Sequence, residues 1–195
     1  MNTLPNKITL CRIVLIPVFM LLAYQGFMLA AFLVYIIACL SDMADGYIAR
    51  KYNQISNFGK FMDPLADKML VLSAMCFFIE SGQMPGWAVA IVLFREFAVS
   101  SIRLLAATDG KVVAANIWGK VKTVSQIIAI ILIFVLQIFL EILNMGFVSV
   151  GSNIVEFCAF VFNIIGNVAL WISTIICVIS GVIYIWDNRK FISEK

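Results

Sequence analysis

Four aspartates stand close together in a chain that is otherwise largely apolar. The 195-residue chain is 63% hydrophobic and has 11 acidic residues, of which Asp42, Asp45, Asp63 and Asp67 fall between residues 41 and 68. The first pair is three residues apart and the second pair four apart, so in helices each pair lies on one face. Carboxylates so close together repel one another unless a cation lies among them. The pattern therefore predicts a site for divalent metal ions.

The ligand chemistry narrows the choice of metal and suggests a reaction. Aspartate oxygens suit hard ions such as Mg²⁺, Mn²⁺ or Ca²⁺, and the absence of His from the chain excludes a zinc site with His ligands. Two hard ions held by four Asp stabilise the attacking and leaving oxygens in phosphoryl or phosphatidyl transfer. Gly46 and Ala49 lie on the Asp42 face, where their small size lets a nucleotide approach the helix. Arg50 would offer a charge to a phosphate.

The stretch resembles the signature of the CDP-alcohol phosphotransferase family, D-x2-D-G-x2-A-R-x8-G-x3-D-x3-D. Every fixed position is present, as Asp42, Asp45, Gly46, Ala49, Arg50, Gly59, Asp63 and Asp67. The resemblance covers essentially the whole chain and implies one membrane domain over residues 1–195. It implies two divalent cations, Mg²⁺ or Mn²⁺, held by the four Asp, with Asp67 also acting as the general base toward an acceptor hydroxyl. The alternative interpretation is a polar loop whose acids are merely solvated.

The resemblance extends to contacts with a CDP-lipid. Asn6 and Thr9 form an N-x-x-T pattern, which on residues alone is an ordinary helix start. Family members carry a similar pattern that contacts the nucleotide or pyrophosphate. The residues expected on the CDP-lipid side are Asn6, Thr9, Gly46, Ala49, Arg50, Ser56 and Gly59.

The elements that must position these residues are apolar helices. The mean hydropathy is +1.04, and the apolar runs are much longer than the strands of a membrane barrel, so they predict helices whose backbone is satisfied internally. We expect an all-α integral membrane protein with six transmembrane helices, at residues 8–24, 28–50, 62–81, 85–107, 118–142 and 155–186. The sixth shows no polar cluster and is expected to be scaffold.

The distribution of Lys and Arg predicts the orientation. Cationic residues gather at the two termini and near residues 51–61 and 108–117, whereas the connections near Gln25–Gly26, Glu80–Pro85 and Glu141–Glu156 contain no Lys or Arg. By the positive-inside rule both termini and the acidic motif are cytoplasmic. We therefore expect a multi-pass protein of the cell's inner (cytoplasmic) membrane, with its active site facing the cytoplasm and no nucleic-acid partner.

Further cations stand at the membrane level of the four Asp. Arg103, Lys120 and Lys122 are expected to bind the phosphate of an acceptor, with Arg12 as a fourth candidate. The alternatives are that the lysines are ordinary positive-inside residues and that Arg12 anchors its helix by snorkelling.

Arg95 and Glu96 lie in the middle of the fourth apolar run. Ionisable groups at that depth are costly and should face inward. They form either a structural polar contact between helices or a contact with substrate, and the sequence leaves both interpretations open.

The resemblance also implies substrates. Family members that use sn-glycerol 3-phosphate are similar to this chain in length, in the N-K-I-T-L-x-R opening and in the R-E and G-K-x-K-T segments. The reaction would convert CDP-diacylglycerol and sn-glycerol 3-phosphate to phosphatidylglycerol phosphate and CMP. The resemblance is compatible with a homodimer, but the residues alone do not predict one.

Two alternatives to this activity stay open. Within the family the acceptor could instead be serine, inositol phosphate or phosphatidylglycerol. From another class, a cation transporter would also place acids among apolar helices. Transporter sites lie near the bilayer midplane and often within repeats, whereas these acids gather at one interface.

Overall fold

The chain folds into long α-helices. The computed structural model describes residues 4–51, 57–108, 116–145 and 151–191, without the side chains of residues 4–5, 43–51, 57–58, 60–61, 64, 108 and 191. The elements are α1 (Leu4–Tyr24), α2 (Met28–Lys51), α3 (Asn57–Glu80), α4 (Gly86–Thr108), α5 (Ile117–Asn144), α6 (Ser152–Asp187) and a 3₁₀ turn, η1 (Arg189–Phe191). Each predicted helix is present, and the largest difference is that α3 begins at Asn57 rather than at residue 62. The all-α prediction is confirmed, since no described residue is in a strand.

The helices have the composition of a membrane-embedded protein. Three of them, α1 from Asn6 to Tyr24, α5 and α6, are long and apolar enough to cross a bilayer, and α2 has a shorter apolar part, Met28–Asp42. Large apolar side chains also cover the outer surface, with Phe94 and Ile117 more than 70% exposed, at 73% and 74%. An apolar surface of this kind is suited to contact with lipid tails.

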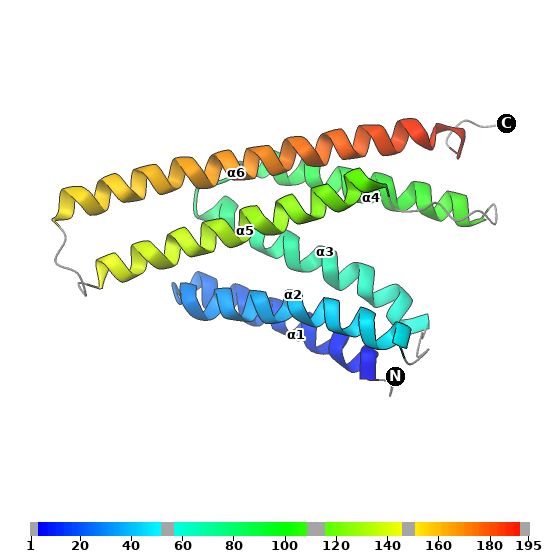
Figure 1. Ribbon diagram of the computed structural model, residues 1–195, viewed down its shortest axis with the longest axis horizontal. Helices are drawn as coiled ribbons and strands as arrows, with labels where there is room; N and C mark the ends of the chain where they lie inside the picture. Colours follow the sequence, from blue (N-terminus) through cyan, green and yellow to red (C-terminus); the bar gives the residue numbers. More distant parts are fainter. Residues whose placement is uncertain (1–3, 52–56, 109–115, 146–150, 192–195) are drawn as a thin grey trace.

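The bundle has two parts that meet in the middle (Figure 1). Helix α1 packs on α2 and α3, and α6 packs on α5 and α4, while α2 and α3 contact α5. The start of α1, the end of α2 and the end of α6 lie toward the same end of the bundle. The acidic motif therefore lies at the end of the bundle where the described chain begins and finishes.

A cluster of aromatic rings joins the two parts. Phe134 of α5 is fully buried, and its ring centroid lies 5.7 Å from Phe19 of α1, 6.1 Å from Tyr35 of α2 and 5.6 Å from Phe78 of α3. Such separations are those of favourable ring pairs. One residue of α5 thus packs against all three N-terminal helices.

Two glycines end helices at the opposite end of the bundle. Gly26 follows α1 with φ +84° and Gly82 follows α3 with φ +74°, a left-handed conformation that favours glycine. The amides of Phe27 and Gln83 then donate to Leu22 and Phe78 at 3.0 and 2.9 Å, the six-to-one bond of a Schellman cap. These tight turns return the chain directly toward the acidic end.

Candidate active site

The first helix holds two of the four motif aspartates. Thr9 Oγ1 donates to Asp63 Oδ1 at 2.7 Å, and an Arg12 guanidinium nitrogen forms an ion pair with Asp42 Oδ1 at 2.6 Å. Thr9 and Arg12 are 1% and 0% exposed, and their three-residue spacing in α1 puts them on one helix face. Carboxylates from α2 and α3 are therefore brought to neighbouring positions along α1.

Both pairs of motif aspartates lie in helices, as their spacing requires if each pair is to share a helix face. Asp42 and Asp45 lie in α2, and Asp63 and Asp67 lie in α3, so each pair shares a helix face. The side chains of Asp45, Ala49 and Arg50, and all of Ser56, lie outside the described part of the chain, and Gly46 is described only as backbone of α2. On the CDP-lipid side, Asn6 is buried in α1 and Gly59 is buried in the first turn of α3.

The acidic motif implies a metal ion, and its ligands would come from carboxylates. Among the described side chains, no group of three acidic or cysteine residues is close enough to hold a metal ion, and Asp45 is not one of those side chains. The described acids supply hard oxygen donors, and α1 holds two of them on one face. In ligand type these residues fit a hard divalent cation.

A cavity of about 720 Å³ opens beside Asp67, between α3, α4 and α5. Its charged wall residues are Lys68, Arg95, Arg103, Lys120, Lys122, Asp67 and Glu96. Five cations against two acids leave an excess of three positive charges, so the cavity is suited to an anionic ligand. The three acceptor cations predicted in α4 and α5 lie together in this wall.

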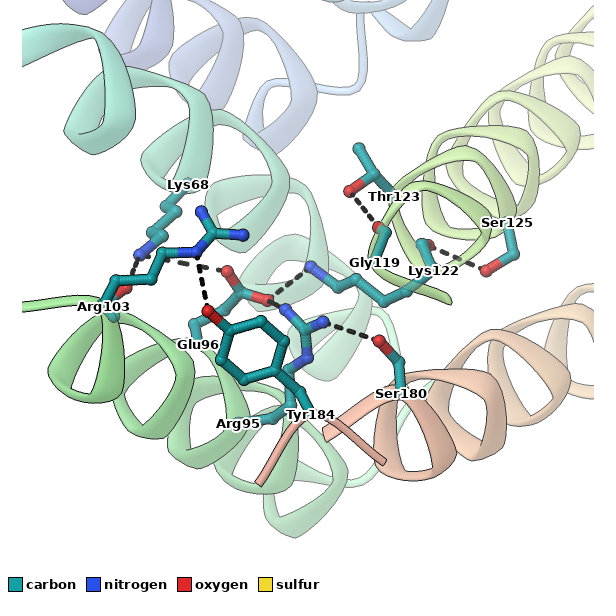
Figure 2. Close-up of polar contacts among 11 residues, drawn as sticks. Lys68, Arg95, Glu96, Arg103, Gly119, Lys122, Thr123, Ser125, Ser180 and Tyr184 are labelled. Carbon is teal, nitrogen blue, oxygen red and sulfur yellow. Dashed lines mark hydrogen bonds and ion pairs between the residues drawn. The ribbon is translucent and has the colours of Figure 1, made fainter. Parts of the chain in front are cut away.

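Glu96 is the centre of an ionic network in the cavity wall (Figure 2). Its Oε1 accepts from Lys122 Nζ at 2.6 Å and from Arg95 at 2.9 Å, and Lys68 Nζ lies 4.0 Å from Oε2. The side chains of Lys122, Arg95 and Glu96 are only 8%, 10% and 13% exposed. Of the two interpretations of the Arg95–Glu96 pair, the structure therefore shows the helix-joining contact, within the wall of the cavity.

The composition of the sixth helix predicted that it is only scaffold, but two of its side chains contact cations of α4. Ser180 Oγ accepts from Arg95 at 2.7 Å, and the Tyr184 hydroxyl accepts from Arg103 Nε at 3.3 Å, with the guanidinium carbon 5.6 Å from the ring centroid. Both α6 residues are buried. The available signal was their four-residue spacing in an apolar helix, which puts both polar groups on one face. The physical reason for the error is that they act singly, each on a cation of α4, and so form no local cluster.

Gly181 lets Arg95 pass close to α6. A Cβ atom at this position would lie 2.7 Å from Arg95 Cγ and 3.6 Å from Arg95 Cβ. These atoms are near the Arg95 backbone, so they cannot swing away as the tip of a long side chain would. The close contact between α6 and Arg95 therefore requires that residue 181 has no side chain.

Gly181→Ala is expected to destabilise the protein by about 1–3 kcal/mol, the usual effect of overpacking. Gly119→Ala is the matched control, because its added Cβ would come no closer than 3.8 Å to Arg95. Since alanine favours a helix over glycine, the control should keep or raise the melting temperature. Thermal unfolding of both variants in the same detergent measures the difference, and equal melting temperatures would contradict the packing argument.

Arg12, the fourth predicted acceptor cation, is not among the described residues that line the cavity. It contacts Asp42 and, through Nε at 3.3 Å, Ser41 Oγ, whereas the other three predicted acceptor cations line the cavity. The charge of Arg12 therefore compensates the carboxylate of Asp42.

The fold and the site together define a membrane-embedded all-α protein in which α1 holds Asp42 and Asp63 and Asp67 lines a cationic cavity. The sequence model of the CDP-alcohol phosphatidyltransferase family matches residues 2–186. The chain belongs to this family.

Similar proteins carry a more specific name. The chain is 38% identical to the CDP-diacylglycerol–glycerol-3-phosphate 3-phosphatidyltransferase of Bacillus subtilis, over 96% of each chain. It is 35% identical to the protein of the same name from Rickettsia bellii, over 97% of each chain. A probable phosphatidylglycerophosphate synthase of Mycobacterium tuberculosis is 38% identical over 65% of this chain and 63% of its own length.

Proposed function

We propose that this protein transfers the phosphatidyl group of CDP-diacylglycerol to sn-glycerol 3-phosphate, giving phosphatidylglycerol phosphate and CMP. The family match and the names of relatives that align over nearly the full chain support this reaction. The observation that carries it in the structure is the cavity in which Asp67 faces an excess of cations. A phosphorylated alcohol has the two groups such a cavity requires, an anion and a hydroxyl.

The chemical step assigns a role to each side of the site. The acceptor hydroxyl oxygen attacks the phosphorus of the phosphatidyl group, the bond from that phosphorus to the CMP oxygen breaks, and CMP leaves. Asp67 takes the hydroxyl proton as general base. It is suited to this role because it lines the cavity and lies one turn beyond Asp63 in α3.

Asp42, Asp45, Asp63 and Asp67 would hold two divalent cations, with Mg²⁺ as the expected ion. When bound, such ions neutralise the pyrophosphate and stabilise the leaving oxygen. Thr9 and Arg12 hold Asp63 and Asp42 on one face of α1, which fixes two of the carboxylates before any ligand binds. Asn6, Thr9, Gly46, Ala49, Arg50, Ser56 and Gly59 would contact the CDP-lipid.

The acceptor phosphate would bind to Arg103, Lys120 and Lys122. The first two are exposed and can meet a soluble ligand, whereas Lys122 is paired with Glu96 and contributes charge from the buried wall. Tyr184 supports this arrangement by holding Arg103.

In the membrane we place all six helices across the bilayer, with both termini and the acidic end in the cytoplasm. The inner membrane of the cell would supply the lipid substrate, and glycerol 3-phosphate would enter from the cytosol. The support is the positive-inside distribution of charge and the common end of the bundle at which α1 begins and α6 ends.

The experiment that tests the proposed function is CMP release by the purified protein from CDP-diacylglycerol, with Mg²⁺ or with EDTA. Glycerol 3-phosphate is compared with serine, inositol phosphate and phosphatidylglycerol. We expect release with glycerol 3-phosphate and Mg²⁺ only. Release with a different acceptor would overturn the substrate, and unchanged release in EDTA would overturn the metal requirement.

Tyr184→Phe is expected to raise the KM for glycerol 3-phosphate by about threefold to tenfold, because it removes one hydrogen bond to an arginine. The kcat and the KM for CDP-diacylglycerol should not change. Tyr35→Phe is the matched control, since Tyr35 is equally buried but lies in the aromatic core. A change in kcat alone would show that Tyr184 does not act through acceptor binding.

A further inference from the structure

Gln126 of α5 is a buried polar side chain in the wall of the cationic cavity. The residue is 1% exposed, and neither its amide nitrogen nor its amide oxygen has a hydrogen-bond partner among the described residues. The proposed mechanism does not use it. Arg95 Nε, in the same wall, is also buried without a described partner. It is a donor, so it cannot serve the amide nitrogen of Gln126, which needs a separate explanation.

An unpaired buried amide is unfavourable, and native proteins satisfy nearly all such groups with protein, water or ligand. The cavity wall also includes Val92, which is 1% exposed, and the partly buried Val71 and Leu72, whose side chains offer no hydrogen bonds. No described residue pairs with either amide atom, and Gln126 lines the cavity, so the contents of the cavity can supply the missing partner. Because the amide both donates and accepts, a hydroxyl group is a natural complement.

The position of Gln126 relative to the cations limits which hydroxyl it can meet. Gln126 lies four residues after Lys122 in α5, on the same helix face and about 6 Å further along the axis. Asp67 lines the same cavity from α3. A ligand that spans this space presents an anion to the cations, one hydroxyl to Asp67 and another hydroxyl to Gln126.

We propose that Gln126 determines acceptor specificity by hydrogen bonding to the non-reacting hydroxyl of a polyol phosphate. This inference rests on the proposed function, because it concerns the acceptor of that reaction. A phosphorylated alcohol with a single hydroxyl would satisfy the cations and Asp67 but leave the Gln126 amide unpaired.

The test compares glycerol 3-phosphate with 3-hydroxypropyl phosphate, which keeps the phosphate and one terminal hydroxyl but lacks the middle hydroxyl. The wild-type protein is expected to prefer glycerol 3-phosphate by roughly 10- to 100-fold in kcat/KM, because a site built for a hydroxyl rejects the analogue that lacks it. Gln126→Met, of similar size, should reduce that preference to less than about threefold. The variant has no amide, so binding the analogue without a middle hydroxyl leaves no buried polar group unpaired. The KM for CDP-diacylglycerol should not change.

The matched control is Gln137→Met. Gln137 lies on the same helix, and its amide oxygen is also buried without a described partner, but it lines a separate cavity of about 170 Å³. This variant should keep the full preference for glycerol 3-phosphate. If Gln126→Met also keeps it, the inference is wrong and an ordered water satisfies the amide.

The wild-type comparison alone can overturn the inference should Gln126→Met fail to fold. Equal kcat/KM of the wild-type protein for glycerol 3-phosphate and 3-hydroxypropyl phosphate would show that no residue recognises the middle hydroxyl. That result would leave the proposed function intact, since glycerol 3-phosphate would still be an acceptor. Failure of glycerol 3-phosphate itself, with release by serine or inositol phosphate, would overturn both.

Discussion

Asp67→Asn is expected to lower the kcat for CMP release by about 10²- to 10⁴-fold, the contribution of a general base, while leaving CDP-diacylglycerol binding measurable. Asparagine keeps the size and one oxygen of the side chain but cannot accept the proton of the acceptor hydroxyl. The location of Asp67 in the wall of the cationic cavity is the reason to expect a loss in the chemical step. The measurement is kcat together with direct binding of a CDP-lipid.

Asp187→Asn is the control for this substitution. Asp187 is an exposed residue at the end of α6 that accepts a 3.4 Å hydrogen bond from Asn116. It should retain wild-type kcat. If Asp67→Asn instead strongly weakens CDP-lipid binding while the remaining bound fraction turns over normally, Asp67 belongs to the donor site and is not the base.

Glu96→Gln is expected to have the largest effect on stability, a loss of about 3–5 kcal/mol in the free energy of unfolding. The cause is that Lys122 and Arg95, whose side chains are only 8% and 10% exposed, would lose the carboxylate that compensates their charge. Ser180 would still accept from Arg95, so Lys122 is the cation that would be left in the costlier position. Unfolding in a fixed detergent, followed by helical signal, measures the loss.

A second variant separates charge compensation from packing. Glu96→Gln combined with Lys122→Met removes both members of the closest pair, and it should recover a large part of the lost stability because no unpaired Lys122 charge remains. Glu80→Gln, an exposed carboxylate at the end of α3, should change stability by less than about 0.5 kcal/mol. If the double variant is no more stable than Glu96→Gln alone, the network is not held by the Lys122 pair.

The sequence predicted the helices well because hydrophobic runs and charge placement are local signals. The predicted range 28–50 corresponds to α2 at Met28–Lys51, and 118–142 corresponds to α5 at Ile117–Asn144. The helical spacing of the acid pairs was also predictable, since it depends only on residues within one turn. The start of α3 was placed too late, because its first turn contains polar residues that a hydropathy argument excludes.

The contacts that organise the candidate site were not predictable in the same way. The Arg95–Ser180 bond joins residues 85 positions apart, and the Arg103–Tyr184 bond joins residues 81 positions apart. A serine and a tyrosine in an apolar helix are unremarkable until their partners are known. Gln126 was missed for a related reason, since its importance lies in being buried without a partner, which only the packed structure reveals.

The same long separations have a consequence for the order of assembly during synthesis. The contacts of Thr9 with Asp63 and of Arg12 with Asp42 lie within the first three helices, so they can close early on a chain that emerges from its N-terminus. The bonds of Arg95 and Arg103 to α6 cannot form until Ser180 and Tyr184 have left the ribosome. Between these moments, a nascent chain has Asp42 and Asp63 already held by α1, while Arg95 and Arg103 still lack their contacts with α6.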